Sequence, residues 1–351
     1  MKHLKLLALA LVAALAFVSC DDDDYEIVPA SHNILVLNNG NWGSNDANIL
    51  GFDYEENVAS PLLFQAANGG KALGDLGQDI LVMGDKFYTA VNGSQVVFVT
   101  DRNLHIVHEI VVNKDGTKLS PRYLCSSGSK VYVTYYEGYL GEIDIKDYSV
   151  RTIAVGNSPE GIAYANNRVY VANSGGATFP NYDKTISVVD TKSFKEIKKV
   201  NVNLNPQNIV MNADGSCLYV NSFGNYADVP ARVQSVSLTD GTYTVSTLDY
   251  NDVKAICGGS NNELYVVTGS YNENWQVEGH VNVYNMNEGK PAREFPAAIA
   301  NFYSISCAGD YIYVGTSDYQ TNGTVYMYNR AGHCVNNFDA QGLNPLKVIS
   351  L

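Results

Sequence analysis

The stretch RVYVANS, residues 168–174, decides the fold, because six other stretches of the chain resemble it. Together they form a repeat with seven copies. The others are ILVLNN from residue 34, KFYTAVN from 86, KVYVTYY from 130, CLYVNSF from 217, ELYVVTG from 263 and YIYVGTS from 311. Their central positions recur every 38 to 53 residues, at Leu35, Tyr88, Tyr132, Tyr170, Tyr219, Tyr265 and Tyr313. This period is too long for leucine-rich or ankyrin repeats and is typical of one four-stranded propeller blade.

Each repeat has the same order of strand and turn signals. A polar or Pro step precedes a short apolar run, as in SPEGIAY at 158–164, and a turn pair such as Asn166-Asn167 or Asp214-Gly215 precedes the central phrase. These turn residues tolerate the positive φ of two-residue hairpin loops. Alternating β-branched and aromatic residues predict strands, and no stretch after residue 19 has a helical period. We therefore predict an all-β chain that forms a seven-bladed β-propeller of four-stranded blades.

The two ends of the repeat region complement each other. The first repeat begins at its second strand, near Asn33, and the last stretch, NPLKVISL at 344–351, resembles a lone first strand. We expect residues 347–351 to pair with residues 34–37, so that the C-terminal strand joins blade 1 and closes the ring. The propeller is expected to span residues 33–351.

The segment before the repeats has the order of a secretory leader. Two lysines precede an apolar run at 6–18 that is too short to cross a membrane as a helix, and Ser19 and Cys20 follow. The segment resembles a bacterial lipoprotein signal. This resemblance implies that residues 1–19 are removed, that Cys20 is lipidated, and that the lipid is the protein's only membrane contact.

Residues 20–32 are expected to form a tether with four consecutive aspartates, at 21–24. The run resembles the signal that sends lipoproteins of Bacteroides-type bacteria to the outer face of the outer membrane. The expected location is therefore the outer membrane, at the cell surface. The alternative interpretation is a solvated, self-repelling linker.

Composition and charge narrow the possible partners. With 46% hydrophobic residues the chain can bury a sizeable core, and its formal net charge of -13 disfavours nucleic acid as a partner. After Cys20, five scattered cysteines remain, at 125, 217, 257, 307 and 334. This odd set matches neither a disulfide framework nor a zinc spacing, so we interpret most of these cysteines as small hydrophobic residues.

A family resemblance rests on the V-Y-V-x-N strands, at 169–173 and, with Leu first, at 218–221. They resemble the strands of YVTN-type propellers, and the resemblance covers residues 33–351. Together with the lipoprotein signal and the acidic run, the chain resembles the surface propeller lipoproteins of gut Bacteroides. Those proteins capture vitamin B12 and pass it to a TonB-dependent outer-membrane transporter. The resemblance implies cobalamin as the ligand and such a transporter as the partner, but it assigns no site residue.

Loops around the mouth of the central channel are the expected ligand-binding face. The loops after the second strands are long in blade 1, at 38–48, and in blades 4, 5 and 6, but short in blades 2 and 3. This wall carries the aromatic candidates Trp42, Phe179, Phe223, Tyr226, Tyr271, Trp275 and Tyr319. Aromatics beside Asn and Gly suit a large planar or sugar-like ligand. The alternative is that they pin long loops to the body.

A second set of candidates follows the Pro-like step of each innermost strand. These residues are expected to ring the channel mouth and are Gln78, Arg122, Glu160, Gln207, Lys254, Tyr303 and Leu346. Arg122 and Lys254 are cations in an acidic protein, which makes them candidates for binding phosphate or carboxylate. The alternative is a water-filled channel whose polar rim satisfies backbone groups.

Local catalytic patterns are missing from the sequence. No HExxH, GxSxG, Gly-rich phosphate loop or EF-hand pattern occurs, so we expect no enzyme, no metal and no cofactor. The leading hypothesis is capture of a small ligand, with cobalamin first and a glycan second. The alternatives are a protein-interaction propeller and a propeller lyase or hydrolase, for which Glu160 is the one evident acid.

Overall fold

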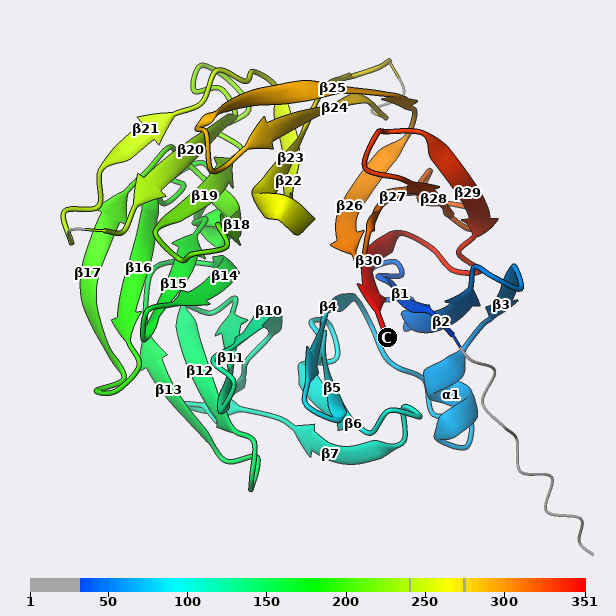
Figure 1. The fold of residues 1–351 in the computed structure, drawn as a ribbon. Helices are drawn as coiled ribbons and strands as arrows, with labels where there is room; N and C mark the ends of the chain where they lie inside the picture. Colours follow the sequence, from blue (N-terminus) through cyan, green and yellow to red (C-terminus); the bar gives the residue numbers. More distant parts are fainter. Residues whose placement is uncertain (1–31, 240, 274–275) are drawn as a thin grey trace, which may run out of the picture. The chain divides into compact units, whose positions relative to one another are not determined.

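The computed structural model describes residues 32–239, 241–273 and 276–351, which belong to one compact unit. The predicted leader at 1–19, Cys20 and the tether up to residue 31 lie outside the described residues, as does Trp275. Seven antiparallel sheets of four strands stand around a common centre (Figure 1). This arrangement confirms the predicted seven-bladed propeller.

Each blade is a sheet of four strands, ordered from the innermost strand outward. Blade 1 contains β30 (Pro345–Ser350), β1 (Ile34–Asn38), β2 (Asn48–Asp53) and β3 (Val58–Ser60). Blade 2 contains β4 (Gly77–Met83), β5 (Lys86–Val91), β6 (Val96–Thr100) and β7 (Ile106–Ile110). Blade 3 contains β10 (Pro121–Ser126), β11 (Lys130–Tyr135), β12 (Tyr139–Asp144) and β13 (Val150–Ala154). Blade 4 contains β14 (Pro159–Ala165), β15 (Arg168–Asn173), β16 (Thr185–Asp190) and β17 (Lys195–Asn201).

The remaining three blades follow the same order. Blade 5 contains β18 (Pro206–Met211), β19 (Cys217–Ser222), β20 (Arg232–Ser237) and β21 (Val245–Thr247). Blade 6 contains β22 (Val253–Gly259), β23 (Glu263–Tyr271), β24 (Val277–Asn285) and β25 (Lys290–Ile299). Blade 7 contains β26 (Phe302–Ala308), β27 (Tyr311–Thr316), β28 (Thr324–Tyr328) and β29 (Cys334–Asp339).

A few short elements lie between the blade strands. They are the helix α1 (Leu63–Ala67), the 3-10 turns η1 (Gly176–Thr178) and η2 (Ser260–Asn262), and a small hairpin of β8 (Asn113–Lys114) and β9 (Thr117–Lys118). The expectation of no helix is therefore wrong at α1. This helix is too short to show a period, and its buried Phe64 packs on Phe98 with ring centroids 4.9 Å apart.

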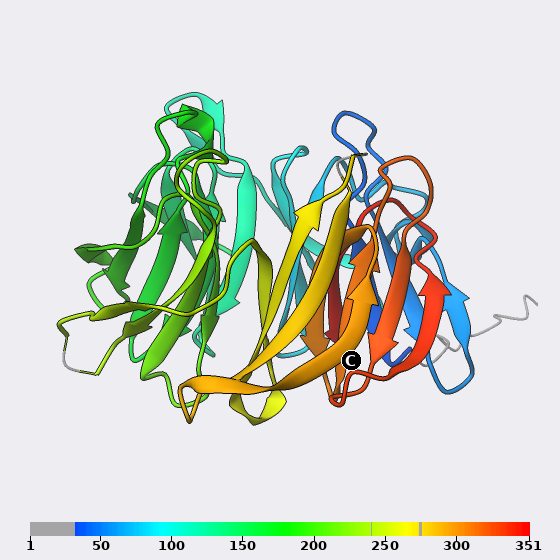
Figure 2. The same ribbon diagram turned by 90° about the horizontal axis from the view of Figure 1, so that it is seen from above.

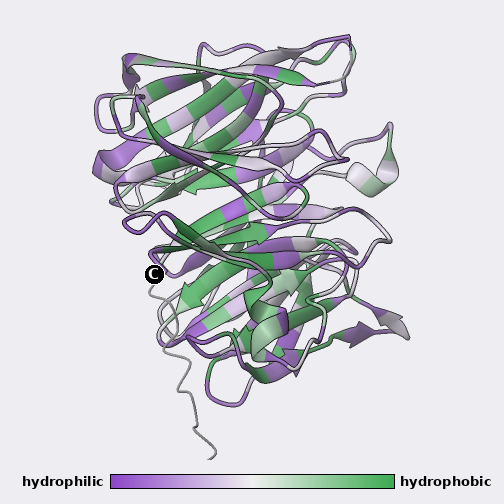
Figure 3. Ribbon diagram, turned by 90° about the vertical axis from the view of Figure 1, so that its right-hand side faces the viewer, coloured by the Kyte–Doolittle hydropathy of each residue, from purple (hydrophilic) through white to green (hydrophobic). Residues whose placement is uncertain are grey.

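The central position of each second strand lies in the core. The seven residues at these positions, Leu35 and the six tyrosines of the repeated phrase, are each at most 3% exposed. They alternate with neighbours that face the next blade, which is why the V-Y-V pattern predicts a strand buried on both faces. Figure 3 shows the result, with hydrophobic residues concentrated in the strands and hydrophilic residues in the loops.

Two of the predicted turn pairs, both Asn-Asn, have positive φ at both residues. Asn166 and Asn167 have φ of 53° and 59°, and Asn261 and Asn262 have φ of 59° and 57°. Two successive positive φ values are the requirement of a type I′ turn, and Asn tolerates them better than most residues.

A repeated backbone contact holds the loops of one face in place. In every blade, the carbonyl just before the innermost strand accepts a hydrogen bond from a backbone N–H at or near the end of the second strand. Examples are Phe223 donating to Asn205 at 2.9 Å and Ser317 donating to Asn301 at 3.0 Å. In six blades the accepting residue has a positive φ, at Leu76, Ser158, Asn205, Asp252, Asn301 and Asn344. Both predicted sets of site residues are thereby brought to the same end of the blades.

The C-terminal strand closes the ring as predicted. β30 is the innermost strand of blade 1 and pairs antiparallel with β1, with Ile34 opposite Ser350 and Leu37 opposite Lys347. On its other flank Lys347 Nζ lies 2.9 Å from Asp79 Oδ1, on β4 of blade 2. The last strand therefore contacts both the start of the ring and the blade that follows it.

Candidate functional site

The second residue of each innermost strand lies around the central channel. These seven residues are the rim set predicted from the repeats: Gln78, Arg122, Glu160, Gln207, Lys254, Tyr303 and Leu346. The channel contains a cavity of about 440 Å³, and five of the seven line it. The other two, Arg122 and Glu160, contact each other.

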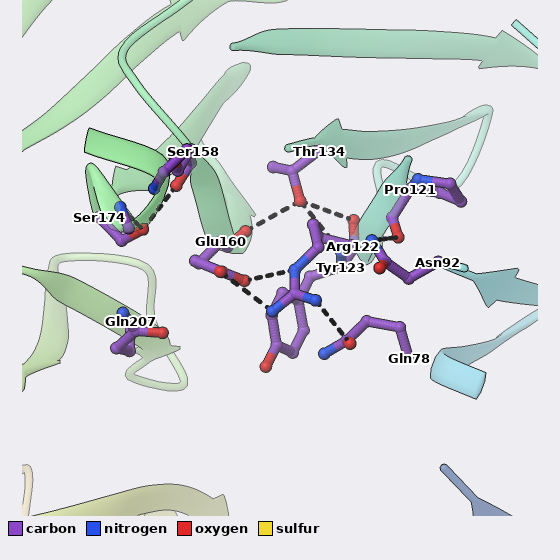
Figure 4. A network of polar contacts seen from close by, with 12 residues as sticks. Gln78, Asn92, Pro121, Arg122, Tyr123, Thr134, Ser158, Glu160, Ser174 and Gln207 are labelled. Carbon is purple, nitrogen blue, oxygen red and sulfur yellow. Dashed lines mark hydrogen bonds and ion pairs between the residues drawn. The ribbon is translucent and has the colours of Figure 1, made fainter. Parts of the chain in front are cut away.

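Arg122 forms a hydrogen-bonded network with its neighbours (Figure 4). Its Nε donates to Glu160 Oε2 at 2.8 Å, its Nη2 to Glu160 Oε1 at 3.0 Å and its Nη1 to Gln78 Oε1 at 2.8 Å. The side chains of Arg122 and Glu160 are 20% and 6% exposed. Burial raises the pKa of Glu160, and the charge of Arg122 opposes that shift. The sequence makes Arg122 a candidate anion ligand, but in the folded protein its charge is matched by the protein's own carboxylate.

Lys254 is placed differently from Arg122. Among the described residues its ammonium has no hydrogen bond and no ion pair, and it lies 4.3 Å from the centroid of the Tyr271 ring. Such a cation–π contact supplies neither a carboxylate nor a hydrogen-bond acceptor to the ammonium. Burial lowers the pKa of Lys254, with Asp252 opposing the shift. Lys254 is therefore the cation of the rim that remains open to a ligand.

An aromatic pocket of about 220 Å³ adjoins the channel, between blades 5, 6 and 7. Six of the predicted site residues line it: Phe223, Tyr226, Lys254, Tyr271, Tyr303 and Tyr319. Phe223, Lys254 and Tyr303 also line the channel cavity, so the two hollows share a wall. Gln276 and Ser317 also line the pocket, and sequence reasoning does not find them because they lie outside the repeated strand patterns.

The loops that carry these aromatics are held by local polar contacts. The Tyr319 N–H donates to Ser317 Oγ at 2.9 Å, and its carbonyl accepts from Asn41 Nδ2 of the blade 1 loop at 3.0 Å. In the blade 5 loop, Asn225 Oδ1 accepts from the N–H groups of Ala227 and Val229 at 3.0 and 2.9 Å. These bonds order the loops without using the aromatic rings.

Exposed aromatic side chains gather on this one face. Within the described residues, five large aromatics are more than half exposed: Trp42 at 76%, Phe179 at 70%, Tyr226 at 66%, Tyr319 at 58% and Tyr271 at 51%. All five lie in or next to the loops after the second strands, which project at one end of the blades (top of Figure 2). The alternative that these rings pin their loops does not account for such exposure.

Some of these aromatic side chains also contact one another, and the Tyr182–Tyr226 contact joins the loops of blades 4 and 5. Phe179 lies against Tyr182 with ring centroids 5.9 Å apart, and Tyr182 against Tyr226 at 6.2 Å. Phe223 lies 6.4 Å from Tyr226 in the same way. The result is a row of rings that leads from the blade 4 loop to the pocket.

Two predictions about this face differ from the structure: Trp42 does not belong to the pocket, and the blade 6 loop is shorter than predicted. Trp42 does not line the pocket. Its loop is held instead by a hydrogen bond from the Gly43 N–H to Asp75, just before β4, at 3.0 Å. The stretch at 268–279, predicted as a long loop, is largely a hairpin, because β23 extends to Tyr271 and β24 begins at Val277. The loops after the second strands of blades 2 and 3 are short, as predicted.

One ion pair in the channel, between Lys347 and a buried carboxylate, is missed by the sequence reasoning. Asp79, whose side chain is 3% exposed, pairs with Lys347 and accepts from the Leu124 N–H at 2.9 Å. The sequence contains one signal for this pair, a carboxylate inside the apolar strand GQDILVM.

Within the described ranges, no group of three or more His, Cys, Asp or Glu residues is placed to hold a metal ion. No helix in the same residues is long and apolar enough to cross a lipid bilayer.

Comparison with known families decides where the chain belongs. Residues 32–300 match the family model described as Domain of unknown function (DUF5074). The chain belongs to the DUF5074 family. In this member, the match covers blades 2 to 6 and most of blade 1, and the innermost strand of blade 1 is contributed by β30, beyond the matched residues.

Solved structures similar to this DUF5074 protein share its fold. Hydrazine synthase of Kuenenia stuttgartiensis is similar with a TM-score of 0.56 and 17% identity, over 72% of this chain and 76% of that chain. A chain of the mitotic checkpoint complex is similar with a TM-score of 0.55 and 14% identity, over 74% and 77%. At such identities the likeness shows the fold alone. No curated protein sequence matches the chain.

Proposed function

We propose that this protein captures a small organic ligand on its loop face, at the aromatic pocket beside the channel mouth. The observation that carries the proposal is that all described Trp, Tyr and Phe residues that are more than half exposed gather on that face. Soluble proteins rarely expose such a group of large apolar side chains unless the surface binds something.

The size of the pocket favours a ligand that is larger than the pocket itself. A volume of about 220 Å³ is below that of pockets which enclose a drug-sized molecule. One part of the ligand would enter the pocket, while the rest lies across the exposed rings of residues such as Tyr226 and Tyr319. Cobalamin has this form, because a planar macrocycle edged with amides carries a separate nucleotide loop with one phosphodiester. It is our first candidate ligand.

The proposal extends to delivery of the ligand. The lipoprotein-like leader, the expected lipidation of Cys20 and the acidic run support an anchored protein on the outer membrane. A rigid propeller with its ligand held on one open face is suited to handing that ligand to a TonB-dependent outer-membrane transporter. This step rests on the family resemblance of the sequence rather than on contacts in the folded protein.

A glycan is the second candidate. The observation that favours it is the row of rings that runs from Phe179 through Tyr182 to Tyr226, with centroids about 6 Å apart. Aromatic rings stack on the apolar faces of sugars, and a row of rings suits a chain of sugars better than a single compact ligand.

Calorimetry with variants of the pocket tests the proposal. The chain from residue 20, with Cys20→Ser, is titrated with cyanocobalamin and then with a panel of glycans. We expect one-to-one binding of cyanocobalamin, weakened at least about tenfold in the double variant Tyr226→Ala, Tyr271→Ala, because each stacking ring contributes about 1–3 kcal/mol. Ile197→Ala, at an exposed apolar residue of the outer strand β17, is the control.

The outcomes separate the candidates. Binding of a glycan but not of cyanocobalamin would replace the first candidate with the second. Equal affinities of the wild type and the double variant for whichever ligand binds would show that the site is elsewhere. Binding of neither class would leave the capture proposal without support and favour a protein partner.

A further inference from the structure

The innermost strands carry three cationic side chains, Arg122, Lys254 and Lys347. Two of them are paired with buried carboxylates of the protein, Arg122 with Glu160 at 2.8 Å and Lys347 with Asp79 at 2.9 Å. Lys254 has no such partner among the described residues. Asp252, the acid nearest in sequence, is exposed and makes no ion pair with it. The protein therefore pairs two of its channel cations directly with carboxylates and leaves the third without an ion pair among the described residues.

Lys254, the cation without an ion pair, lies where a ligand would reach it. Its side chain lines both the aromatic pocket and the channel cavity, and the Tyr271 ring lies against its ammonium at 4.3 Å. An ammonium has three N–H donors, and one ring face does not satisfy them. The charge is thus held at the junction of the two hollows, beside the rings of Phe223 and Tyr303, where a stacked ligand would end.

Leaving a half-buried cation without a directly paired carboxylate costs free energy, because the group loses hydration without gaining a hydrogen-bond partner. The lowered pKa of Lys254 has this origin. The chain has a formal net charge of -13, so carboxylates for pairing are plentiful. A bound anion would offset the cost and gain charge-assisted hydrogen bonds.

We propose that Lys254 is the anion subsite of the pocket, and that the natural ligand carries a phosphate or carboxylate next to the group that stacks on the aromatic rings. This inference rests on the proposed capture function and specifies its ligand class. The stacking group lies between Tyr226, Tyr271 and Tyr319, and the anionic group points toward the channel. Arg122 takes no part, because Glu160 already occupies its guanidinium.

Small probes that fit the pocket test the subsite without the natural ligand. Phenyl phosphate and benzoate are compared with their neutral counterparts phenol and benzyl alcohol, by ligand-observed NMR with the Cys20→Ser chain that is used for calorimetry. We expect the wild-type pocket to bind at least one of the two anions and to bind its neutral counterpart at least about tenfold more weakly. Which anion binds more tightly distinguishes a phosphate ligand from a carboxylate ligand.

Variants assign the effect to Lys254. Lys254→Met is expected to lose the preference for the anion, and Lys254→Arg to retain most of it. Lys198→Met removes the same charge from an exposed position on β17 and is expected to bind like the wild type. Thermal unfolding of all three variants shows whether any loss of binding reflects loss of the fold.

Two results would overturn the subsite: failure of the folded wild type to bind either anion, or equal anion binding by the wild type and folded Lys254→Met. The same variants titrated with cyanocobalamin keep the two proposals apart. If the wild type does not bind cyanocobalamin but binds phenyl phosphate more tightly than Lys254→Met does, the cobalamin assignment fails while the anion subsite stands. If cyanocobalamin binds the wild type and Lys254→Met equally, capture stands and the subsite fails.

Discussion

At the scale of single residues, the central tyrosines of the second strands stabilise the fold through their rings. Tyr313 is 1% exposed and packs with Val325 and Val348 in the cluster that joins blade 7 to blade 1. Its hydroxyl is buried and has no hydrogen-bond partner among the described residues, and burial raises the pKa of that hydroxyl. The ring therefore stabilises the interface between the two blades, while the hydroxyl adds a cost.

Two substitutions at this position separate the ring from the hydroxyl. Tyr313→Ala is expected to lower the free energy of unfolding by about 3–5 kcal/mol, because it leaves a cavity between blades. Tyr313→Phe keeps the ring and removes an unsatisfied buried group, so its stability should equal or slightly exceed that of the wild type. Urea unfolding measures both. A Phe variant as unstable as the Ala variant would mean that the hydroxyl has a partner essential to the fold.

The sequence predicts which residues face the channel but not how they pair. A Pro-like step marks the start of each innermost strand, so counting one residue further places Gln78 through Leu346 on the rim. The pairs Arg122–Glu160 and Lys347–Asp79 join positions 38 and 268 residues apart, and only the closed ring brings them together. For this reason sequence reasoning assigns Arg122 and Lys254 the same role, whereas the structure separates them.

At the scale of elements, a charged cluster ties blade 6 to blade 7. Glu263 on β23 is paired with Arg293 on β25 and, at 3.0 Å, with Arg330 in the turn after β28, and it accepts from the Tyr265 hydroxyl at 2.9 Å. Burial acts to raise the pKa of Glu263, but the hydrogen bonds from Arg293, Arg330 and Tyr265 outweigh it and hold that pKa below its usual value.

The lowered pKa of Glu263 predicts a specific dependence of stability on pH. A carboxylate with a lowered folded-state pKa contributes its stability above the ordinary value of 4.5, and the contribution is lost as pH falls through the lowered value. Glu263→Gln is expected to cost about 3 kcal/mol at pH 7 and to show a weaker loss of stability on acidification. The control Glu109→Gln, in an exposed pair with Lys71, should cost under about 1 kcal/mol. Parallel acid profiles of Glu263→Gln and the wild type would contradict this explanation.

Elements with a period or a turn pair are predictable, and those without one are not. Strands flanked by Asn-Asn or Asp-Gly pairs appear where the sequence predicts them. The helix α1 is missed because five residues give no period, and the ends of β23 and β24 are missed because polar residues continue the strands past the apolar core. Backbone pairing of β23 with β24, rather than hydrophobic burial, sets the length of that hairpin.

At the scale of the whole molecule, stability depends on closing the ring. β30 is the innermost strand of blade 1 and contributes Val348, 6% exposed, to the interface with blade 7. Without it, β1 becomes an unprotected edge and Asp79 loses its counter-ion. The structure therefore predicts that a few residues at the end of the sequence control the stability of all seven blades.

Truncation tests this dependence. A chain that ends at residue 344 is expected to unfold at a temperature lower by roughly 10 °C or more. A chain that ends at residue 350 lacks only Leu351, which is 52% exposed, and should unfold like the full chain. Thermal unfolding followed by circular dichroism measures both. Equal unfolding temperatures for the two truncated chains would show that β30 does not close the ring.

The two ends of the propeller differ in a way that agrees with capture on one face. The turns before the second strands are tight Asn- and Gly-rich pairs, whereas the loops at the other end carry the exposed rings and adjoin both cavities. The most direct test is hydrogen exchange of the protein with and without saturating cyanocobalamin. We predict slower exchange confined to the loops at 223–231 and 317–323 and to the tip of the β23–β24 hairpin. Protection at the opposite end of the blades, or no protection by a ligand that calorimetry shows to bind, would refute capture on this face.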